Sequence, residues 1–480
     1  MSNNSSVISD EMLQEQRGYC AAVKEIYGQK LRRQPLAYTQ TFGCQQNEAD
    51  TELIRGMLAD MGFGFCESIA EADIVIINTC AIREHAEMRV YGNVGELSHA
   101  KKNNPELVTV LCGCMAQQEH VTDKIKNSYP YVDIVFGTHA LPRFPQILYN
   151  CLKRKKRVFD IDGDEKGTII EGVEPVRKPG YSAWLSIMYG CNNFCSYCVV
   201  PYVRGRERSR TPRAVIEEFK SLVAQGYKDI TLLGQNVNSY GRGLDNACDF
   251  PSLLEQINDI DGDFRVRFMT SHPKDATPGL FDVMAKCDKV CNSIHLPVQA
   301  GSDRVLKDMN RSYTAEKYLS LIDYARKVMP DITITSDIIV GFPGETNEDF
   351  QKTIDLLEKV RFDSLFTFIF SPRKGTKAYD MPDVLTKDEK QRNFDRLLEV
   401  QNRISKEKNE EYVGKRLRVL VGEEENERNY NNEYTKLART EGFKLVYLRG
   451  AEGLEGQYAD VIIEKSSTWA LFGSVEIGEK

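Results

Sequence analysis

The chain has 480 residues, of which 41% are hydrophobic and 28% are charged, and its formal net charge is −7. This composition is that of a globular protein of about three domains; it excludes a bundle of membrane-spanning helices and a protein that binds nucleic acid through overall positive charge. No signal peptide precedes the 13 cysteines, so we expect a cytoplasmic protein that uses cysteine to bind metal rather than to form disulfides.

Residues 1–34 are expected to form a partly ordered polar extension with one helix at most. Between residues 35 and 151, apolar strands alternate with helical stretches, which predicts an α/β domain with a mostly parallel sheet. The strands are expected at residues 36–42, 73–78, 107–112 and 132–136, and the helices from about Asn47, Glu84 and Gln117.

A cysteine follows each of the first three strands of this domain. Ligands of such sheets bind beyond the carboxyl ends of the strands, so these cysteines can converge on one metal centre. They are Cys44, Cys80 and Cys114. Cys112 also lies near the third strand end, but strand alternation makes it a packed side chain rather than a ligand. The other cysteines outside the central loop described below are interpreted as ordinary buried thiols: Cys20, Cys66, Cys151, Cys248, Cys287 and Cys291.

The connection that follows the first domain is charged. Residues 151–157 are mostly basic, and residues 160–174 are rich in acidic side chains. Charge runs are usually solvated surface, and we interpret the basic run in this way. Contact with RNA is the less favoured alternative.

Residues 177–408 form a second series of alternating strands and helices. Strands are expected at residues 183–188, 229–233, 264–269, 292–296, 332–340 and 363–370. Six βα units are fewer than the eight of a closed barrel, so we expect an open, partial (β/α)6 barrel.

The first strand of this series leads into a loop that holds three cysteines within eight residues, Cys191, Cys195 and Cys198. Pro201 should prevent a regular helix from following at once. Thiolates bind soft metals, which leaves zinc and an iron–sulfur cluster as candidates. A closed zinc site needs four ligands, and no fourth Cys or His lies nearby at the usual paired spacing. We therefore favour a four-iron cluster with one open iron; zinc and unliganded thiols remain as alternatives.

Polar or glycine-rich turns follow several other strands of the partial barrel, where such barrels bind their ligands. Any one of these turns alone is ordinary turn chemistry. The candidate residues for a cofactor pocket are Gln235, Asn236, Ser271, Gln299 and Gly341. His272 and His295 are equally consistent with a structural role and with a role in the site.

Five arginines lie within ten residues directly after the cysteine loop, at positions 204, 206, 208, 210 and 213. The guanidinium group suits phosphates and base edges, and this run is adjacent to the reaction centre, so contact with nucleic acid is predicted. The alternative is that these arginines pair with carboxylates of the protein itself and brace the loop.

The last part of the chain, residues 411–475, follows a charged helical stretch and has a different pattern. Strands with alternating apolar and polar residues are expected at 416–421, 444–448, 458–463 and 470–475. They predict a small antiparallel β-barrel. This segment has no basic surplus, so its charge alone does not point to RNA.

The cysteine pattern resembles a known family. The loop Cys-x3-Cys-x2-Cys, with Tyr197 before its third cysteine, resembles the signature of radical S-adenosylmethionine (SAM) enzymes. With the three upstream cysteines, it resembles the methylthiotransferase family of these enzymes, over about residues 35–475. This implies an N-terminal cluster domain (35–151), a radical SAM core (177–408) and a C-terminal TRAM domain (411–475), a module that binds RNA.

The resemblance implies two 4Fe-4S clusters and a SAM site. A first cluster, whose open iron binds SAM, would be held by Cys191, Cys195 and Cys198. A second cluster, which carries or positions sulfur, would be held by Cys44, Cys80 and Cys114. The SAM pocket would be formed by Tyr197, Gln235, Asn236, Ser271, Gln299 and Gly341. The resemblance identifies no catalytic acid or base.

The sequences around Cys44 and Cys80 most resemble the branch that modifies isopentenyladenosine beside the anticodon of tRNA. The implied reaction replaces the hydrogen at position 2 of the modified adenosine with a methylthio group, and SAM serves as methyl donor and as source of the 5′-deoxyadenosyl radical. Two departures from the family's pattern are Gln46, where methionine is common, and Tyr189. Neither is a proposed ligand.

The implied partners are the anticodon stem-loop of tRNA, an electron donor such as a flavodoxin or ferredoxin, and a sulfur source. We expect a monomer that needs no membrane. Two rival functions within the family are methylthiolation of threonylcarbamoyladenosine and of a ribosomal protein. A rival from another class is a non-catalytic iron–sulfur or zinc protein that binds RNA, and such a protein would not bind SAM.

Overall fold

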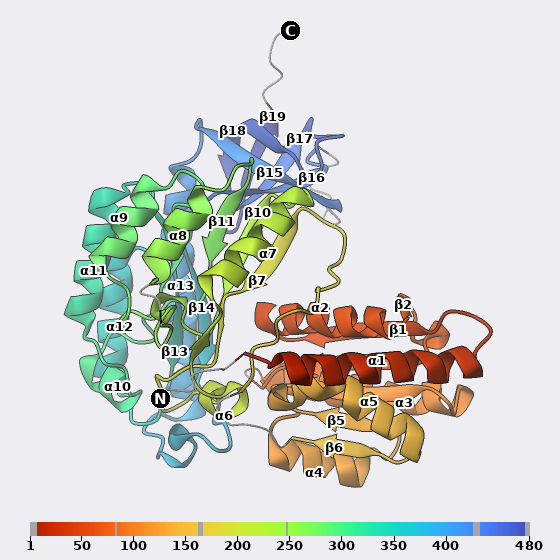
Figure 1. The fold of residues 1–480 in the computed structure, drawn as a ribbon. Helices are drawn as coiled ribbons and strands as arrows, with labels where there is room; N and C mark the ends of the chain where they lie inside the picture. The colour runs from red at the N-terminus through yellow and green to blue at the C-terminus, as the bar shows by residue number, and fades with distance from the viewer. Residues whose placement is uncertain (1–6, 82–83, 162–166, 246–247, 426–432, 476–480) are drawn as a thin grey trace.

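The computed structural model describes residues 7–81, 84–161, 167–245, 248–425 and 433–475. Three parts follow one another along the chain: a six-stranded parallel sheet with helices, two three-stranded sheets that together form a partial barrel, and a small closed barrel (Figure 1). The predicted fold class is confirmed. Within the described residues, no helix combines the length and the apolar character that a membrane span requires.

The first sheet has the strand order β2-β1-β3-β4-β5-β6, and all its neighbours are parallel. Its strands are β1 (Leu36–Phe42), β2 (Gly64–Phe65), β3 (Ile74–Thr79), β4 (Val108–Gly113), β5 (Ile134–Phe136) and β6 (Val158–Asp160). Its helices are α1 (Asp10–Lys30), α2 (Gln45–Asp60), α3 (Glu84–Asn103), α4 (Glu119–Ser128) and α5 (Phe144–Arg154). The central strands β3 and β4 are buried on both faces, since α1, α2 and α5 cover one side and α3 and α4 the other.

Helix α1 corrects the expectation of a partly ordered extension. It spans 21 residues, begins at a cap in which Ser9 accepts a hydrogen bond from the backbone of Met12, and packs against α5 and α2. Its buried residues Cys20, Val23 and Tyr27 form one narrow apolar stripe at helical spacing. The rest of its surface is polar, which is why the segment resembles a solvated tail in the sequence. Residues 1–6 of the expected extension lie outside the described residues.

The middle part has the strand orders β11-β10-β7 and β12-β13-β14, with every neighbouring pair parallel. Its six strands are β7 (Ser182–Ser186), β10 (Asp229–Leu233), β11 (Arg265–Phe268), β12 (Ser293–His295), β13 (Thr333–Val340) and β14 (Ser364–Ile369). A backbone bridge from Val266 to Val290 joins β11 to the segment before β12. The result is an open barrel with β7 and β14 at its two edges, as predicted.

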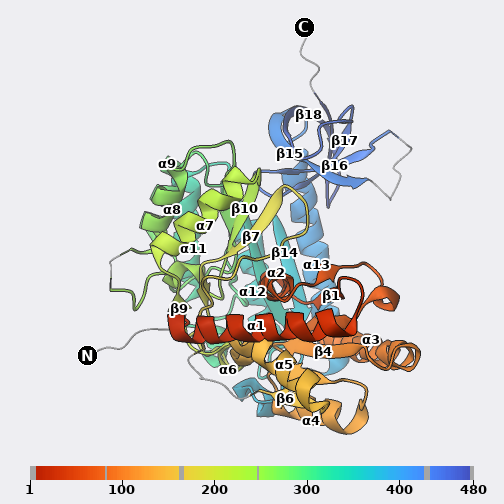
Figure 2. The same cartoon turned by 45° about the vertical axis from the view of Figure 1, so that its right-hand side comes forward.

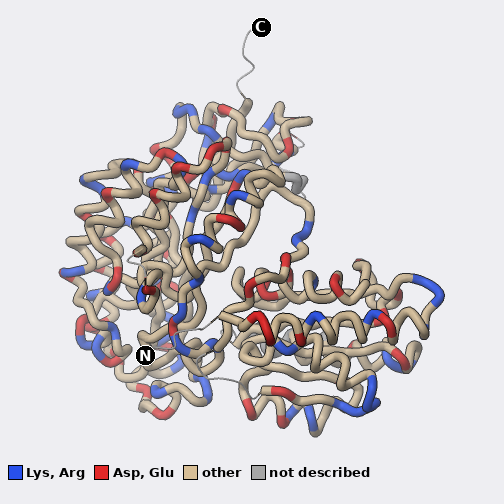
Figure 3. Tube along the Cα trace, viewed as in Figure 1, with Lys and Arg blue, Asp and Glu red and all other residues tan. Residues whose placement is uncertain are grey.

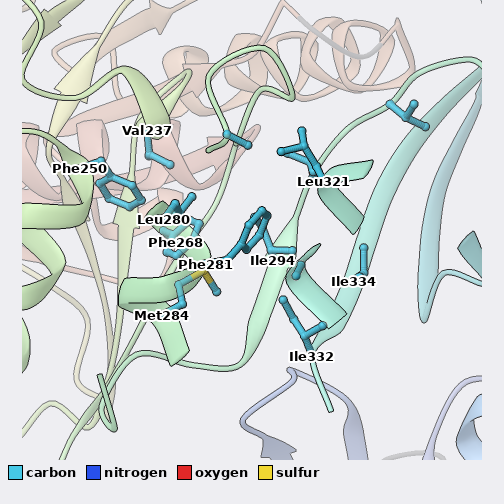
Figure 4. Close-up of a cluster of buried hydrophobic side chains, with 14 of the residues drawn as sticks. Val237, Phe250, Phe268, Leu280, Phe281, Met284, Ile294, Leu321, Ile332 and Ile334 are labelled. Carbon is cyan, nitrogen blue, oxygen red and sulfur yellow. The ribbon is translucent and has the colours of Figure 1, made fainter. Parts of the chain in front are cut away.

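Helices cover the outside of this partial barrel (Figures 1 and 2). They are α7 (Pro212–Ala224), α8 (Phe250–Asn258), α9 (Pro278–Lys286), α10 (Asp303–Asp308), α11 (Ala315–Val328), α12 (Asn347–Val360) and α13 (Lys387–Glu410). Figure 4 shows part of the apolar core between strands and helices, where Phe268, Leu280 and Phe281 lie together. Smaller elements are β8 (Met188–Tyr189), β9 (Arg208–Ser209), α6 (Val200–Arg204), and 3₁₀ turns at Ile69–Glu71, Thr138–Arg143, Val237–Ser239 and Lys377–Asp380.

The last part is a closed barrel with the order β15-β16-β17-β19-β18. Its strands are β15 (Arg416–Glu425), β16 (Lys436–Thr440), β17 (Leu445–Arg449), β18 (Tyr458–Ser466) and β19 (Leu471–Val475). The prediction of four antiparallel strands is wrong in two respects: β16 is a fifth strand, and β17 pairs with β19 in parallel. Strand directions cannot alternate around a closed ring of five, so one parallel pair is unavoidable.

The small barrel contacts the amino ends of the middle strands. Arg265, the first residue of β11, donates to the carbonyl oxygen of Arg439 at 3.1 Å, and Lys444 pairs with Asp363 just before β14 at 3.0 Å. The cysteine loop lies beyond the carboxyl end of β7, at the opposite end of the partial barrel. A ligand that contacts both must extend along the length of the partial barrel.

Acidic and basic residues are distributed over all three parts of the molecule (Figure 3). Because charges of both signs are spread in this way, any contact with RNA depends on local groups.

Candidate functional site

The cysteine loop after β8 is held by its own backbone. Gly190 adopts a positive φ of 74°, and a Cβ at this position would clash with the backbone of Arg206. The amide of Cys191 donates to the carbonyl of Gly205 at 3.2 Å, and that of Cys198 to the carbonyl of Cys195 at 3.0 Å. Cys191 and Cys195 are buried. The loop therefore presents its thiols from a fixed backbone.

The three thiols of this loop lie near one another and near a buried cation. Burial, with a further contribution from the charge of Cys195, raises the pKa of Cys191 to about 11 and that of Cys198 to about 12. The guanidinium of Arg311 donates to the sulfur of Cys195 at 3.4 Å. These thiols do not readily lose their protons by themselves. A metal group that replaces the protons would stabilise the thiolates, and the neighbouring cation would add to this effect.

A short helix, α6, follows the loop, and this corrects the prediction for Pro201. The helix begins at Val200, and Pro201 lies in its first turn. Proline is tolerated there because the amides of the first turn have no acceptor within the helix. The helix turns the chain back toward the first domain.

The second set of cysteines lies at the carboxyl edge of the first sheet. Cys44 precedes α2 as its cap residue, Cys80 directly follows β3, and Cys114 directly follows β4. A hydrogen bond from Cys80, supported by the charge of Arg204, lowers the pKa of Cys44 to about 6 although burial opposes it. Burial raises the pKa of Cys114 to about 11, and the charge of Cys44 acts in the same direction. These three thiols are thus neighbours.

Cys112 lies on the other side of its strand. It packs in the apolar core beneath α1, α2 and α5, and burial raises its pKa well above the ordinary value. The position agrees with the prediction that Cys112 is a packing residue.

Two asparagines brace the second set of cysteines. The side chain of Asn47 donates to Asn78 and to the carbonyl of Thr79, both at 3.0 Å, and Asn78 donates back to the carbonyl of Asn47 at 2.9 Å. Because all these groups are buried, the bonds fix the start of α2, just after Cys44, to the end of β3, just before Cys80. Ile82 and Arg83, part of the motif after Cys80, lie outside the described residues.

Arg204 joins the two sets of cysteines. It belongs to α6, directly after the first loop, yet its side chain donates to the sulfur of Cys114 at 3.1 Å and to Asp50 at 2.7 Å. Val199 and Val203 pack with Cys114 in a small apolar cluster. The two candidate metal sites therefore lie on either side of one five-residue helix.

The donor sets fit iron–sulfur clusters. Each set offers three sulfur donors, and each has one arginine that donates to a cysteine sulfur and so stabilises a thiolate. In the described part of the chain, no three His, Cys, Asp or Glu side chains converge closely enough to hold a single metal ion. A four-iron cluster does not require such convergence, because its cysteines bind different irons.

Unsatisfied polar atoms lie at the carboxyl ends of β10 and β11. Among the described residues, buried atoms without a hydrogen-bond partner include Oδ1 of Asn236, Oγ of Ser271 and Nε2 of His272. Burial, with the charges of Arg311 and Lys274, lowers the pKa of His272 to about 2, which keeps the ring neutral. Buried polar atoms are nearly always paired, so this group of three fits a polar ligand such as SAM.

The other residues predicted for the cofactor pocket either form hydrogen bonds that involve the backbone or lie at bends of it. Gln235 accepts from the amide of Gly190 and donates to Gln46 at 3.4 Å, so it links the cysteine loop to the first domain. Gln299, with a φ of 73°, exchanges backbone hydrogen bonds with β13. Gly341 has a φ of 71°, and the ring of Tyr197 packs against the following Phe342. Apart from Tyr197 in the loop itself, the predicted residues follow strands at the end of the partial barrel that carries the cysteine loop.

Some arginines of the run at positions 204–213 are buried and others are exposed. Arg210 is buried and pairs with Glu171 and Glu218, both at 2.7 Å. Arg204 is buried at the cysteine site, so direct contact of these two arginines with nucleic acid is excluded. Arg206 is exposed, and its guanidinium lies 4.4 Å from the centre of the Phe194 ring. Bracing is thus the correct interpretation for two of the five.

Several of these residues carry no signal in the sequence. Arg311 reaches Cys195 across 116 positions, and Asp50 reaches Arg204 across 154. No local pattern marks either contact. Asn47 and Asn78 lie within the cysteine motifs of the sequence. Side-chain amides next to strand ends could have predicted that they hold these motifs together by hydrogen bonds.

Three family models match the chain. The Radical SAM superfamily matches residues 185–357, the Uncharacterized protein family UPF0004 matches 37–137, and the TRAM domain matches 410–475. The chain is 47% identical over 475 residues to a protein of Acetivibrio thermocellus named tRNA-2-methylthio-N(6)-dimethylallyladenosine synthase, with 98% of each chain covered. It is 48% identical over 467 residues to a protein of the same name from Clostridioides difficile, with 96% of this chain and 97% of the other covered.

A solved structure shares the fold. It is the radical S-adenosylmethionine methyltransferase TsrM of Kitasatospora setae, determined with tryptophan and a SAM analogue. The TM-score is 0.53 at 14% identity, over 72% of this chain and 75% of the other.

Proposed function

This chain belongs to the tRNA-2-methylthio-N(6)-dimethylallyladenosine synthases, which are radical SAM enzymes, and we propose that it adds a methylthio group to position 2 of N6-dimethylallyladenosine beside the anticodon of tRNA. As a radical SAM enzyme it uses SAM and a 4Fe-4S cluster. The observation that best supports the proposal is the placement of two three-cysteine sets on either side of α6. The direct test is the nucleoside composition of tRNA from cells that lack this protein.

We propose that Cys191, Cys195 and Cys198 hold the SAM-binding cluster, and that a second 4Fe-4S cluster is held by Cys44, Cys80 and Cys114. When bound, the first group would supply the chemistry of reductive SAM cleavage, and the second would supply or position the sulfur. The chain's own contribution is to bury both sites and to place Arg311 and Arg204 against their thiolates. Arg204 would also keep the two sites at a constant separation, because it bonds to the first domain from a helix of the second.

The residues of the proposed SAM pocket would have different tasks. Asn236 and Ser271 would contact SAM directly, since each has a buried side-chain oxygen without a partner among the described residues. Both ends of the Gln235 amide are already bonded, so it would act by holding the cysteine loop. Gln299 and Gly341 would offer backbone groups, and Tyr197 would close the pocket with its ring.

The proposed RNA partner is the anticodon stem-loop, whose backbone would run from the cysteine loop toward the small barrel. An electron donor of the flavodoxin or ferredoxin class and a sulfur source complete the reaction, and we propose that the enzyme works as a monomer in the cytoplasm. The threonylcarbamoyladenosine and ribosomal-protein branches remain the alternatives that a substrate assay separates from this function.

Exposed cations near the cysteine loop are proposed to contact the RNA backbone. Arg206 lies on the loop side, and Lys374 lies in the exposed segment after β14, where the amide of Ala378 donates to the carbonyl of Ser196 at 2.7 Å. Arg206→Ala with Lys374→Ala should weaken tRNA binding and reduce the slope of log K against log salt by about 0.7 for each phosphate that the variant no longer neutralises. Filter binding at several salt concentrations measures both effects.

A matched control for this variant is Lys327→Ala with Lys359→Ala. Both lysines are exposed at the ends of outer helices, and the change in charge is the same. This control should leave the salt slope unchanged. Arg210→Ala should instead destabilise the fold by about 1–3 kcal/mol, because the half-buried Glu171 loses its ion pair with Arg210 while Glu218 keeps its pair with Arg177. Equal slopes for the Arg206/Lys374 variant and the wild type would contradict the proposed RNA contact.

A further inference from the structure

The edge strand β14 carries two exposed aromatic residues. Phe366 is 47% exposed and Phe368 is 40% exposed, whereas Leu365 on the other face of the strand packs against the apolar core. An edge strand with large apolar side chains in contact with solvent is unfavourable unless a partner covers it. The two rings are on the same face of the strand, because alternate residues of a strand point to the same side.

That face is the inside of the partial barrel. Phe366 is in register with Asp337 of β13, and Phe368 with Ile339. On β13 these inward positions are half-buried, while Ser336, Ile338 and Val340 are buried under the helices. The ring of Phe366 lies 5.6 Å from the ring of His295, in an edge-to-face arrangement.

A polar pair lies beside the aromatic rings. One ring nitrogen of His295 is 3.4 Å from the carboxylate of Asp337, and the other is 3.0 Å from the hydroxyl of Thr335. The inner wall thus combines an apolar surface, from Phe366 and Phe368, with groups that can hydrogen-bond. It can hold a ligand that has both an apolar branch and a polar ring edge.

This wall is continuous with the proposed SAM pocket. The amide of Gln299 donates to the carbonyl of Asp337 at 2.9 Å, and the amide of Ile339 donates to the carbonyl of Gln299 at 3.0 Å. The aromatic rings are therefore one strand away from a residue of that pocket. The opposite edge of the partial barrel, β7, is covered by α2.

We propose that Phe366 and Phe368 are the residues that select the dimethylallyl-modified base, by packing against its alkenyl chain and its ring while the carboxylate of Asp337, held by His295, accepts a hydrogen bond from its polar edge. This inference rests on the proposed function and names residues that determine its specificity. Stacking of a nucleic-acid base on an aromatic side chain strengthens binding by about 5- to 150-fold per ring.

The test compares two anticodon stem-loop RNAs, one with N6-dimethylallyladenosine and one with unmodified adenosine, on the reconstituted full-length enzyme. Phe366→Ala with Phe368→Ala should lower kcat/KM for the modified RNA by at least about 5-fold and bring the ratio between the two RNAs toward one. Reductive SAM cleavage without RNA should be unchanged. Phe366→Leu with Phe368→Leu should restore part of the discrimination, because leucine keeps the apolar surface.

Phe443→Ala is the matched control, since Phe443 is 48% exposed on the small barrel at the far end of the molecule. It should keep the ratio between the two RNAs. Unchanged discrimination in the Phe366/Phe368 alanine variant would overturn the inference, and so would weaker SAM binding, which would assign the rings to the cofactor. Failure of the proposed function is a separate result, in which the wild-type enzyme itself forms no methylthio product on the modified RNA.

Discussion

Replacement of Cys191, Cys195 or Cys198 by alanine should abolish reductive cleavage of SAM and reduce the iron content of the reconstituted protein from about eight to about four atoms per chain. Each of these cysteines is one of three proposed ligands of its cluster, so a single loss leaves two irons without protein ligands. The second set of cysteines belongs to a different domain and should keep its cluster. Formation of 5′-deoxyadenosine after reduction and an iron assay measure the two effects.

The control for this first prediction is Cys248→Ala. Cys248 lies outside both sets and is only partly buried, so its loss should change neither iron content nor SAM cleavage. Zinc with negligible iron after anaerobic reconstitution of the wild type would contradict the assignment. An alanine variant of the loop that still cleaves SAM would also contradict it.

Replacement of Cys44, Cys80 or Cys114 by alanine should eliminate the methylthio product and leave SAM cleavage intact. These cysteines are neighbours at the carboxyl edge of the first sheet, and Arg204 connects Cys114 to the helix that follows the other cysteine loop. Product analysis by mass spectrometry, with 5′-deoxyadenosine measured in the same reaction, separates the two activities.

Cys112→Ala is a close control for this second prediction, because Cys112 lies two positions from Cys114 but faces the apolar core. It should keep both clusters and lose only a small amount of stability from the cavity. If Cys112→Ala lost the second cluster and Cys114→Ala kept it, the choice of ligand would be wrong.

Much of the fold can be predicted because it is encoded in local patterns. The strand predicted at 36–42 has these bounds in the structure, since its β-forming residues are bordered by clear turn signals. The full length of helix α1 is not predicted, because its apolar stripe is narrow and the rest of its surface is polar. The parallel pairing of β17 and β19 depends on ring closure, which no single strand reveals.

The residues of the candidate site can be predicted where they form a motif with fixed spacing in the sequence. They cannot be predicted where a contact joins residues that are far apart in the sequence. The cysteine loop is a compact motif, and the other three cysteines follow consecutive strands of the predicted sheet. The arginine run gives no indication that Arg204 points inward and Arg206 outward, because the carboxylate that pairs with Arg204, Asp50, lies in another domain. The contact of Arg311 with Cys195 could not be predicted for the same reason, because the two residues are far apart in the sequence and meet only in the folded chain.

The most direct measurement is mass spectrometry of nucleosides from the tRNA of cells that lack this protein, compared with cells in which the gene is restored. We expect 2-methylthio-N6-dimethylallyladenosine to be absent without the protein, with N6-dimethylallyladenosine accumulated in its place, and the restored cells to regain the methylthio form. Restoration with the Cys114→Ala variant should fail to do so. An unchanged amount of 2-methylthio-N6-dimethylallyladenosine in the cells that lack the protein would contradict the proposed function.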